Sequence, residues 1–577
     1  MTKILILIFN LFCFRKMRKY KSREIVLTFI LFGLIAGISK AQNIPQLRKN
    51  GEATQLIVNG KPFLMISGEL HNSTSSSLSY LESIWPDLKN LQLNSVIASI
   101  SWEQFEPKEG VYDFTLVDGI IQKARDHNLK LCLIWFATWK NGQSSYTPMW
   151  VKKDIKRFFR VKDKNGNNLE VISPSCKEGM IADAKAFAVL MKHTKEVDKD
   201  QTVIVMQVNN EVGIKVDIDY CKESLSLFQS EVPARLIDYL IRNKNTLNVE
   251  LKTVWALNDY MTRGTWTEIF GDNPSAREFF MAWQYANYLN EICKQGKKEY
   301  NLPMYVNAAL VHYLNELPGL YLNGGPVSRV IDIYKAAAPY IDLIAPDIYL
   351  PTFKSTCATY TRSDNPLFIP ECTTDAGKAF YAFAEHDAIC FAPFGIDRAI
   401  HNISFGLAYS VLNELAPEIL NYQGTGKMHG FLREKDETGT ELTMGKYVMV
   451  ITFSNKEKPG YGLVIQTAED EFIFAGSNFK VVFSSTDKRQ KAVIGQVWEG
   501  KYEEKNWIPL RLLNGDETSI NRALFVTGRN LIPFFIPSSD KLLYPSRIQE
   551  HYDSTSEVNS KIVSPAIYKV TMYSHDM

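Results

Sequence analysis

The chain has 577 residues, too many for one domain, and its hydrophobic fraction of 45% is enough for a large core. Lys and Arg number 65 against 63 Asp and Glu, which gives a formal charge of +2. This balance excludes a strongly basic chain, so we expect no nucleic-acid partner. Aromatic residues make up 12% of the chain and could pack the core or form platforms on which sugar rings stack.

Residues 1–41 predict a secretory signal peptide. Basic residues at positions 15–23 precede an apolar run, Ile25 to Ile38, and Ser39-Lys40-Ala41 resembles a small-x-small cleavage site. The run is too short to span a bilayer comfortably. We therefore expect an exported protein, periplasmic or extracellular, that keeps no stable membrane span after cleavage. The sequence does not indicate the oligomeric state.

Residues 42–423 predict a (β/α)8 TIM barrel, an α/β fold. Apolar runs of strand length recur, each breaks into polar or aromatic residues at its C-terminal end, and helical periodicity follows most of them. In such a barrel the C-terminal ends of the strands carry the chemistry. The predicted strands cover residues 63–67, 93–100, 129–136, the run that begins at Thr202, 303–308, 341–345, 367–369 and 389–392.

Two further regions are predicted around this barrel. After the fourth strand, residues 214–301 show helical periodicity, which predicts a helical insertion. From residue 424 to 577 the sequence changes to short runs of alternating or β-branched residues, separated by turns that contain Gly, Asn and Asp. This second pattern predicts an antiparallel β-sandwich domain at the C-terminus.

The fourth strand ends in an unusual cluster of polar residues. The stretch TVIVMQVNNEVG (202–213) begins as a buried strand and then places Asn209, Asn210 and Glu211 at its tip. Such groups must meet solvent, a ligand or one another, because burying them alone is costly. By itself, this stretch is equally compatible with a cap for the next helix.

A second carboxylate, Glu371, ends the predicted seventh strand. Strands four and seven face each other across the mouth of a closed barrel, so Glu211 and Glu371 can flank one bond. Glycoside hydrolysis requires such a pair, and a spacing of about 5–5.5 Å gives the retaining, double-displacement route. The sequence therefore predicts a glycosidase that needs no metal and no cofactor.

The neighbours of the pair predict separate roles for the two carboxylates. Tyr349, which follows the sixth strand, could reach Glu371 and hold it as an anion and nucleophile. The charge on Glu371 would then raise the pKa of Glu211 and keep it protonated as the acid. Asn210 could donate to a sugar hydroxyl, with the equatorial 2-hydroxyl as the natural target because contacts there strengthen in the transition state.

Three other side chains are candidates for substrate binding, each with a structural alternative. Trp102 and Trp135 could stack on the sugar or pack the rim of the barrel. His71 could bind the sugar or serve as a satisfied structural histidine.

Several motifs together resemble a known family. SWEQFEPKEGVYDF (101–114), VNNEVG (208–213) and FIPECT (368–373) resemble the clan of retaining (β/α)8 glycosidases. Within this clan, ISGELHNS (66–73) and the spacing of residues 102–114 resemble glycoside hydrolase family 35, the β-galactosidases, and in particular a bacterial branch with a C-terminal β-domain. The resemblance implies Glu211 as acid/base, Asn210 as its companion amide and Glu371 as nucleophile.

The sequence departs from the family pattern at the sugar contacts. The usual HYxR after the first strand is His71-Asn72-Ser73-Thr74, and the usual Ala-Glu-Trp after the third strand is Ala137-Thr138-Trp139, which removes one sugar-binding carboxylate. The resemblance therefore implies the reaction more firmly than the sugar.

We therefore expect an exported, retaining, exo-acting β-galactosidase that removes terminal β-D-galactose from oligosaccharides or polysaccharide side chains. Two alternatives stay open: another retaining β-glycosidase, such as a β-glucosidase, β-xylosidase or endo-glycanase, and a non-catalytic glycan-binding barrel. The intact pair of Glu211 and Glu371 argues against the second alternative.

Overall fold

The computed structural model describes residues 44–313, 315–513, 515–518, 523–526 and 564–577. The expected signal peptide, residues 1–41, lies outside the described residues. Residues Pro45–Met577 form one compact unit. Among the described residues, no helix combines the length and the apolar character needed to cross a membrane.

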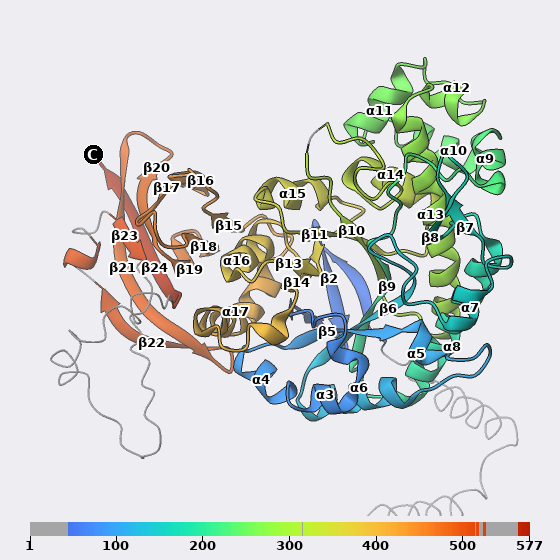
Figure 1. The fold of residues 1–577 in the computed structure, drawn as a ribbon. Coiled ribbons are helices and arrows are strands. Elements are labelled where there is room, and N and C mark those ends of the chain that lie inside the picture. The colour runs from blue at the N-terminus through green and yellow to red at the C-terminus, as the bar shows by residue number, and fades with distance from the viewer. Residues whose placement is uncertain (1–43, 314, 514, 519–522, 527–563) are drawn as a thin grey trace, which may run out of the picture. The chain divides into compact units, whose positions relative to one another are not determined.

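Parallel strands close into the predicted eight-membered barrel (Figure 1). The seventh strand is interrupted at Pro370 and therefore consists of two short pieces, β12 and β13. β12 pairs with β14 and β13 pairs with β11. Glu69 closes the ring, because it bridges to Ile97 on one side and to Phe394 on the other. The barrel strands are β4 (Met65–Ile66), β5 (Ser95–Ser101), β6 (Lys130–Lys140), β9 (Val203–Asn210), β10 (Met304–Ala309), β11 (Leu343–Ile348), β12 (Phe368–Ile369) with β13 (Glu371–Cys372), and β14 (Cys390–Phe391).

Helices follow the barrel strands in sequence and surround them (Figure 1). The first helical stretch is divided in two at Ser83-Ile84, just before Pro86. Short helices α5 (Trp102–Phe105) and α7 (Met149–Lys153) and the 3-10 turns η1 (Thr74–Ser76), η2 (Ser328–Val330) and η3 (Ile396–Arg398) lie in the connections. The main helices are α3 (Leu78–Glu82), α4 (Trp85–Asn90), α6 (Thr115–Asp126), α8 (Lys177–Val197), α13 (Pro274–Glu299), α14 (Ile331–Ala337), α15 (Phe353–Tyr360), α16 (Ala376–Glu385) and α17 (Ile403–Tyr422).

The insertion after the fourth strand is helical, as predicted, but shorter than expected. The long helix α13 packs against both α8 and α14, so it belongs to the outer ring of the barrel. The predicted insertion of residues 214–301 included this helix, because a buried amphipathic helix has the same periodicity in either place. The added helices are α9 (Lys222–Phe228), α10 (Ala234–Arg242), α11 (Val249–Ala256) and α12 (Trp266–Phe270).

The inside of the barrel is a packed apolar core. Tyr305 on β10 contacts Cys132 on β6 and Phe368 on β12, which are not its neighbours in the sheet, so all three side chains face inward. Successive side chains along a strand point to opposite faces. Asn307, two residues after Tyr305, therefore also faces inward but lies nearer the C-terminal mouth. Polar groups thus form the top layer over an apolar core.

Smaller sheets complete the N-terminal and loop regions. Strands β1 (Gln46–Asn50), β2 (Ala53–Val58) and β3 (Lys61–Phe63) form an antiparallel sheet, with a hairpin turn between Val58 and Lys61. Leu56 and Val58 pack into the core of the barrel. A second hairpin, β7 (Arg160–Lys162) with β8 (Asn168–Ile172), lies in the long loop after β6.

After α17 the described chain forms two antiparallel sheets that share one hydrophobic core, which confirms the predicted sandwich. The change of structure falls between Tyr422 and Met428, around the predicted boundary at residue 424. One sheet contains β15 (Met428–Leu432), β18 (Tyr461–Ala468), β19 (Glu471–Ser477), β24 (Ala566–Asp576), β21 (Gln490–Glu503) and β22 (Asn506–Leu513), and the other contains β16 (Gly439–Met444), β17 (Tyr447–Phe453), β20 (Phe479–Ser485) and β23 (Ala523–Val526).

Candidate active site

The end of β9 has an unusual backbone. Asn209 and Glu211 both adopt positive φ angles, 58° and 43°, in the left-handed region that residues other than glycine rarely occupy. Side chains hold this conformation: Asn209 Oδ1 accepts from the Trp139 amide at 2.8 Å, and Asn307 Oδ1 accepts from the Glu211 amide at 2.9 Å. Such local strain is kept where the surroundings require it and is frequent at functional sites.

Asn307 connects the residues of the mouth. Because its oxygen accepts from the Glu211 amide, its Nδ2 faces the acidic groups. It donates to Asn210 Oδ1 at 3.0 Å and to Asp347 Oδ2 at 2.7 Å, and it lies 3.4 Å from Glu371 Oε1. The buried side chain of Asn307 therefore links the ends of β9, β11 and β13.

The two predicted catalytic carboxylates lie together. Side-chain oxygens of Glu211, Asp347 and Glu371 are all within 4.8 Å of one another. Tyr349 donates its hydroxyl hydrogen to Glu371 Oε2 at 2.8 Å, the contact that the sequence suggested. Three carboxylates this close could share a cation, but Asn307 and Tyr349 already donate hydrogen bonds into the group. Hydrogen bonds from Asn307 and Tyr349 can equally stabilise carboxyl groups that share protons with one another.

The Asn210 side chain is oriented by its neighbours. Its oxygen accepts from Gln207 at 2.9 Å and from Asn307, while its nitrogen donates to Asn141 at 3.1 Å. An amide nitrogen carries two hydrogens. Among the described residues only Asn141 takes one, so the second hydrogen can serve a ligand hydroxyl.

Burial controls the protonation of the acids in the mouth. It raises the pKa of Glu371 to about 7, with the Glu211 charge acting in the same direction. The Lys140 charge and the Tyr349 hydrogen bond lower the pKa of Glu371. Burial also raises the pKa of Glu211, against the opposing effect of Lys140. The Glu211 charge thus raises the pKa of Glu371, which is the reverse of the predicted direction. Both carboxyl groups bind a proton more tightly than exposed glutamates do, as a general acid must.

Lys140 is the cation that acts on all four acids of the mouth. Its ammonium group lies 4.9 Å from the ring centre of Phe136, whose side chain is in the barrel core. The positive charge lowers the pKa of Glu69 and Asp347 as well as those of the catalytic pair. Burial nevertheless keeps the pKa values of Glu69 and Asp347 well above their usual range.

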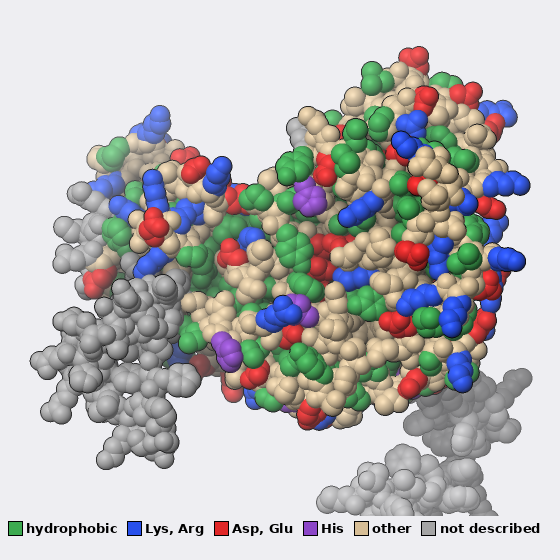
Figure 2. Space-filling view, in the orientation of Figure 1, with side chains coloured by type: hydrophobic (Ala, Val, Ile, Leu, Met, Phe, Trp, Pro, Cys, Tyr) green, Lys and Arg blue, Asp and Glu red, His purple; other side chains and the backbone are tan. Residues whose placement is uncertain are grey.

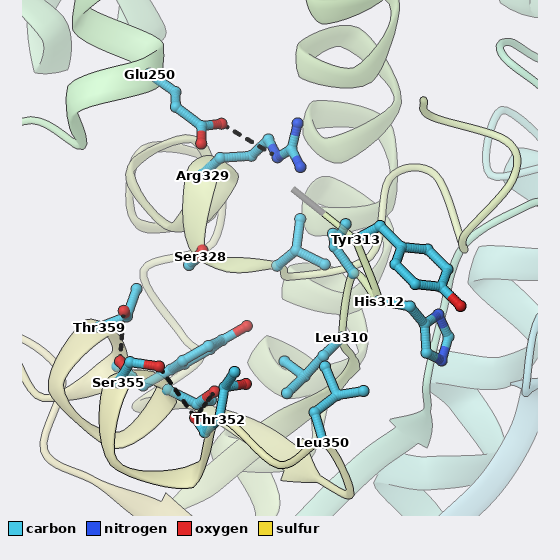
Figure 3. A pocket seen from close by; sticks show the side chains of 14 residues that line it. Glu250, Leu310, His312, Tyr313, Ser328, Arg329, Leu350, Thr352, Ser355 and Thr359 are labelled. Atoms are coloured by element: carbon cyan, nitrogen blue, oxygen red, sulfur yellow. Dashed lines mark hydrogen bonds and ion pairs between the residues drawn. The ribbon is translucent and has the colours of Figure 1, made fainter. Parts of the chain in front are cut away.

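Cavities adjoin the mouth on two sides. In the space-filling view, acidic side chains are visible in the middle of the face, over the ends of β10 and β11 (Figure 2). A cavity of about 640 Å³ is lined by Lys140 and Asn141. A second, of about 330 Å³, is lined by His312 and Tyr313 after β10 and by Leu350 after β11. In Figure 3, the rings of His312 and Tyr313 lie on one side of the cavity, and the hydroxyl groups of Ser355 and Thr359 on α15 lie on the other.

The structure does not bring two predicted sugar platforms to the mouth. Trp102 and Trp135 are both fully buried, at 0% exposure. The indole of Trp102 donates to Glu106 at 2.7 Å, and that of Trp135 donates to Asp183 at 2.7 Å. Their faces are covered by protein, so we withdraw both as substrate contacts. An aromatic residue near a strand end fits either place by sequence, and here core packing prevails.

His71 is partly exposed, but its side chain is also held by a protein partner. Its Nδ1 lies 2.9 Å from Asp397 Oδ1, and its ring packs edge-on against Phe394. Asp397 also accepts from Thr74, so the histidine forms part of a network that fixes the loop after β4. This arrangement favours the structural alternative for His71.

Sequence reasoning missed three residues that the structure places in the mouth. Asn141 and Lys140 follow the predicted end of the third strand, because β6 continues to residue 140 instead of stopping at 136. Asn307 lies inside the predicted fifth strand, where it is the first polar residue after an apolar run. The available signal was the one used for Glu211, namely a polar side chain at the C-terminal end of a barrel strand.

Comparisons with known proteins match separate parts of the chain. Residues 79–273 match a family profile described as "Beta-galactosidase", of the glycoside hydrolase 42 type, and residues 405–525 match a "Domain of unknown function (DUF5597)". Over residues 79–273 the barrel is therefore similar to β-galactosidase domains of the glycoside hydrolase 42 type. The first profile covers the barrel from α3 to the insertion helices, and neither profile supports family 35 in particular.

Individual relatives are distant. "Beta-galactosidase 14" of Arabidopsis thaliana is 26% identical over 160 residues, which is 25% of this chain and 17% of that protein. A β-galactosidase from Bacillus circulans sp. alkalophilus is 15% identical, with a TM-score of 0.42 over 62% of this chain and 57% of that one. The catalytic domain of β-amylase from Paenibacillus polymyxa is 11% identical, with a TM-score of 0.40 over 57% of this chain and 91% of that one.

The pH dependence of any reaction at this site is expected to respond differently to two substitutions. Tyr349→Phe removes a hydrogen bond that lowers the pKa of Glu371, so the acidic limb of kcat/KM should move up by about one pH unit. Lys140→Met removes a charge that lowers the pKa of both Glu211 and Glu371, so both limbs should move to higher pH.

The measurement is kcat/KM for an aryl galactoside from pH 4 to 9, a range chosen to span ordinary carboxyl pKa values and the raised ones. Lys123→Met is the matched control, because Lys123 pairs with Glu82 on the exposed surface of α6. If both site variants keep the wild-type profile, Tyr349 and Lys140 do not set these pKa values.

Proposed function

We propose that the protein is a retaining, exo-acting β-galactosidase. The observation that carries the proposal is the geometry of Glu211 and Glu371, whose side-chain oxygens lie within 4.8 Å across the barrel mouth. Retaining glycosidases place their carboxyl groups about 5–5.5 Å apart, whereas inverting enzymes need about 6.5–9.5 Å to admit a water molecule. The short distance supports direct attack by one carboxylate on the sugar.

In the first step, Glu371 acts as the nucleophile. Its carboxylate oxygen forms a bond to C1 of the sugar while the bond from C1 to the glycosidic oxygen breaks. Glu211 transfers its proton to that departing oxygen, so the leaving group departs as a neutral alcohol. Tyr349 supports this assignment, because its hydrogen bond to Glu371 favours the anion.

In the second step, Glu211 acts as the base. Having lost its proton, it takes one from a water molecule, whose oxygen bonds to C1 while the bond between C1 and Glu371 breaks. The sugar leaves with its original configuration at C1, and Glu211 is again protonated. Asn210 is proposed to hold the 2-hydroxyl through its second amide hydrogen.

The substrate is proposed to be an oligosaccharide or a polysaccharide side chain. Glu211, as the acid, must lie beside the leaving group, and its charge interacts with that of His312, which follows β10. The cavity of about 330 Å³ at the end of β10, lined by Tyr313, His312 and several hydroxyl groups, gives such a leaving group room. We also propose export, on the signal-like pattern of residues 1–41.

The proposal is tested by a screen of 4-nitrophenyl glycosides with the purified protein. The β-galactoside should be cleaved with a higher kcat/KM than the β-glucoside, β-xyloside and α-galactoside. If the protein prefers the β-glucoside or the β-xyloside, the proposed mechanism stands, but galactose is not its sugar. Absence of cleavage of every β-glycoside would overturn the proposed function and favour a glycan-binding barrel.

A further inference from the structure

Glu69 is a buried carboxyl group in the mouth that no part of the mechanism above uses. Its side chain is 1% exposed, and neither of its oxygens has a hydrogen-bond partner among the residues that the structure describes. A buried polar group without a partner costs free energy, and most such groups in folded proteins are paired. A bound ligand that supplies hydrogen-bond partners to Glu69 would offset this free-energy cost.

The backbone of Glu69 is fixed on both sides. Its amide donates to Pro393 O at 2.8 Å, and its carbonyl accepts from the amide of Ile396 at 3.0 Å. The same residue bridges to Ile97 of β5. Glu69 is thus the point at which the first strand joins its two neighbours, and its side chain cannot leave the barrel without breaking these bonds.

The direction of the side chain follows from the alternation along the strand. Met65 belongs to the core inside the barrel. Every second amide from Met65 to Glu69 donates to a carbonyl of residues 389–393, so the paired backbone continues beyond β4. Residues that differ by an even number along such a backbone share a face, so Glu69 points into the barrel as Met65 does, but four residues nearer the mouth. Its charge interacts with Glu371, Lys140 and Glu211, which places it in the same chamber as the catalytic pair.

The position of Glu69 in the mouth differs from that of the catalytic pair, Glu211 and Glu371. Glu211 ends the fourth strand and Glu371 begins the second piece of the seventh, and both act at C1 in the proposed mechanism. Glu69 lies on the first strand, on another part of the wall. A ring whose C1 lies between the pair presents its remaining hydroxyl groups to other parts of this wall.

We propose that Glu69 binds hydroxyl groups of the sugar ring other than the 2-hydroxyl, and so determines which sugar the site accepts. The inference rests on the proposed function, because it places a sugar between Glu211 and Glu371. A carboxyl group offers two oxygens, which match two hydroxyl groups on neighbouring ring carbons.

The experiment compares Glu69→Gln with the wild type on 4-nitrophenyl β-galactoside and on its 3-deoxy, 4-deoxy and 6-deoxy analogues. On the full substrate, kcat/KM should fall about 10-fold, the effect of one lost hydrogen bond, because the amide offers one oxygen where the carboxyl group offers two. On the analogue that lacks the bound hydroxyl, the same substitution should cost less than about threefold, because the interaction is already absent.

Glu278→Gln is the matched control. Glu278 is also a buried glutamate, but it accepts from Tyr321 and faces Arg329 outside the mouth. Its substitution should lower the melting temperature and change kcat/KM by the same factor on every analogue. The same uniform factor for Glu69→Gln would show a merely structural role and overturn the inference.

The design separates this inference from the proposed function. Wild-type protein that cleaves the galactoside, together with a uniform effect of Glu69→Gln, overturns the inference alone. Wild-type protein that cleaves no glycoside overturns the proposed function and this inference with it. If Glu69→Gln does not fold, Glu69→Asp retains the charge, shortens the side chain and should show the same dependence on the missing hydroxyl.

Discussion

Glu371→Gln is expected to lower kcat by roughly 10⁴- to 10⁶-fold, the range seen when a covalent nucleophile is removed. Glutamine has nearly the same shape and can still accept from Tyr349, which now donates to the Glu371 carboxylate. It cannot form the bond to C1. Substrate binding should therefore persist while turnover is lost, which equilibrium binding and single-turnover kinetics can separate.

The same variant should be more stable than the wild type at alkaline pH. Burial raises the pKa of Glu371 to about 7, above the value of about 4.3 for an unfolded glutamate. The folded state therefore binds the proton more tightly, and its stability falls as the pH rises from about 4.3 to 7. Glutamine does not ionise, so the gain should be absent at pH 4 and roughly 3–4 kcal/mol at pH 8.

The control for both effects is Glu385→Gln. Glu385 is a partly exposed glutamate on α16 that pairs with His429, away from the mouth. It should leave turnover unchanged, and any change in the pH dependence of the melting temperature should come from His429, whose pKa is raised by its hydrogen bond to Glu385. Turnover by Glu371→Gln within tenfold of the wild type would refute the nucleophile assignment.

Glu211→Ala is expected to show an effect that depends on the leaving group. General acid catalysis contributes about 10²- to 10⁴-fold, and only when the departing oxygen needs a proton. Lactose and other alkyl galactosides should therefore lose activity by that factor in the first step. A dinitrophenyl galactoside leaves without a proton, so its first step should continue and the covalent intermediate should accumulate.

Azide provides the check on the second role of Glu211. The base that activates water is absent from Glu211→Ala, but azide is nucleophilic without proton removal. Added azide should restore turnover of the dinitrophenyl galactoside and give β-galactosyl azide as the product. Equal loss for activated and unactivated leaving groups, with no rescue, would show that Glu211 does not carry the proton.

The barrel could be predicted from the sequence because each strand has the same form. An apolar run that ends in polar residues occurs along the chain at βα spacing, and β5, β9 and β11 begin and end close to the predicted limits. The end of the long insertion was not predictable, because α13 has the same amphipathic periodicity as the helices added before it.

The catalytic pair could be located for a related reason. Glu211 and Glu371 follow strands that the hydrophobic pattern identifies, and the geometry of a closed barrel then brings them together. The partners of this pair depend on finer detail. Lys140 enters the mouth because β6 is four residues longer than its apolar run, and Asn307 does so because its strand alternates.

The aromatic residues show the limit of sequence reasoning most clearly. Trp102 and Trp135 stand near strand ends, where a sugar platform or a core residue would look the same. Their hydrogen bonds to Glu106 and Asp183 show that both indoles are packed inside the protein. The bond from Trp135 to Asp183 joins residues that are distant in sequence, so it has no local signal.

The central claim is that Glu371 attacks the sugar while Glu211 supplies the proton. The most direct test uses a β-galactoside with fluorine at C2 and a dinitrophenyl leaving group. The fluorine slows both formation and hydrolysis of the covalent intermediate, whereas the activated leaving group speeds its formation alone, so the intermediate accumulates. Peptide mass spectrometry of the inactivated protein should locate one fluorogalactosyl group on Glu371. Attachment to Glu211, Asp347 or Glu69 instead would contradict the account.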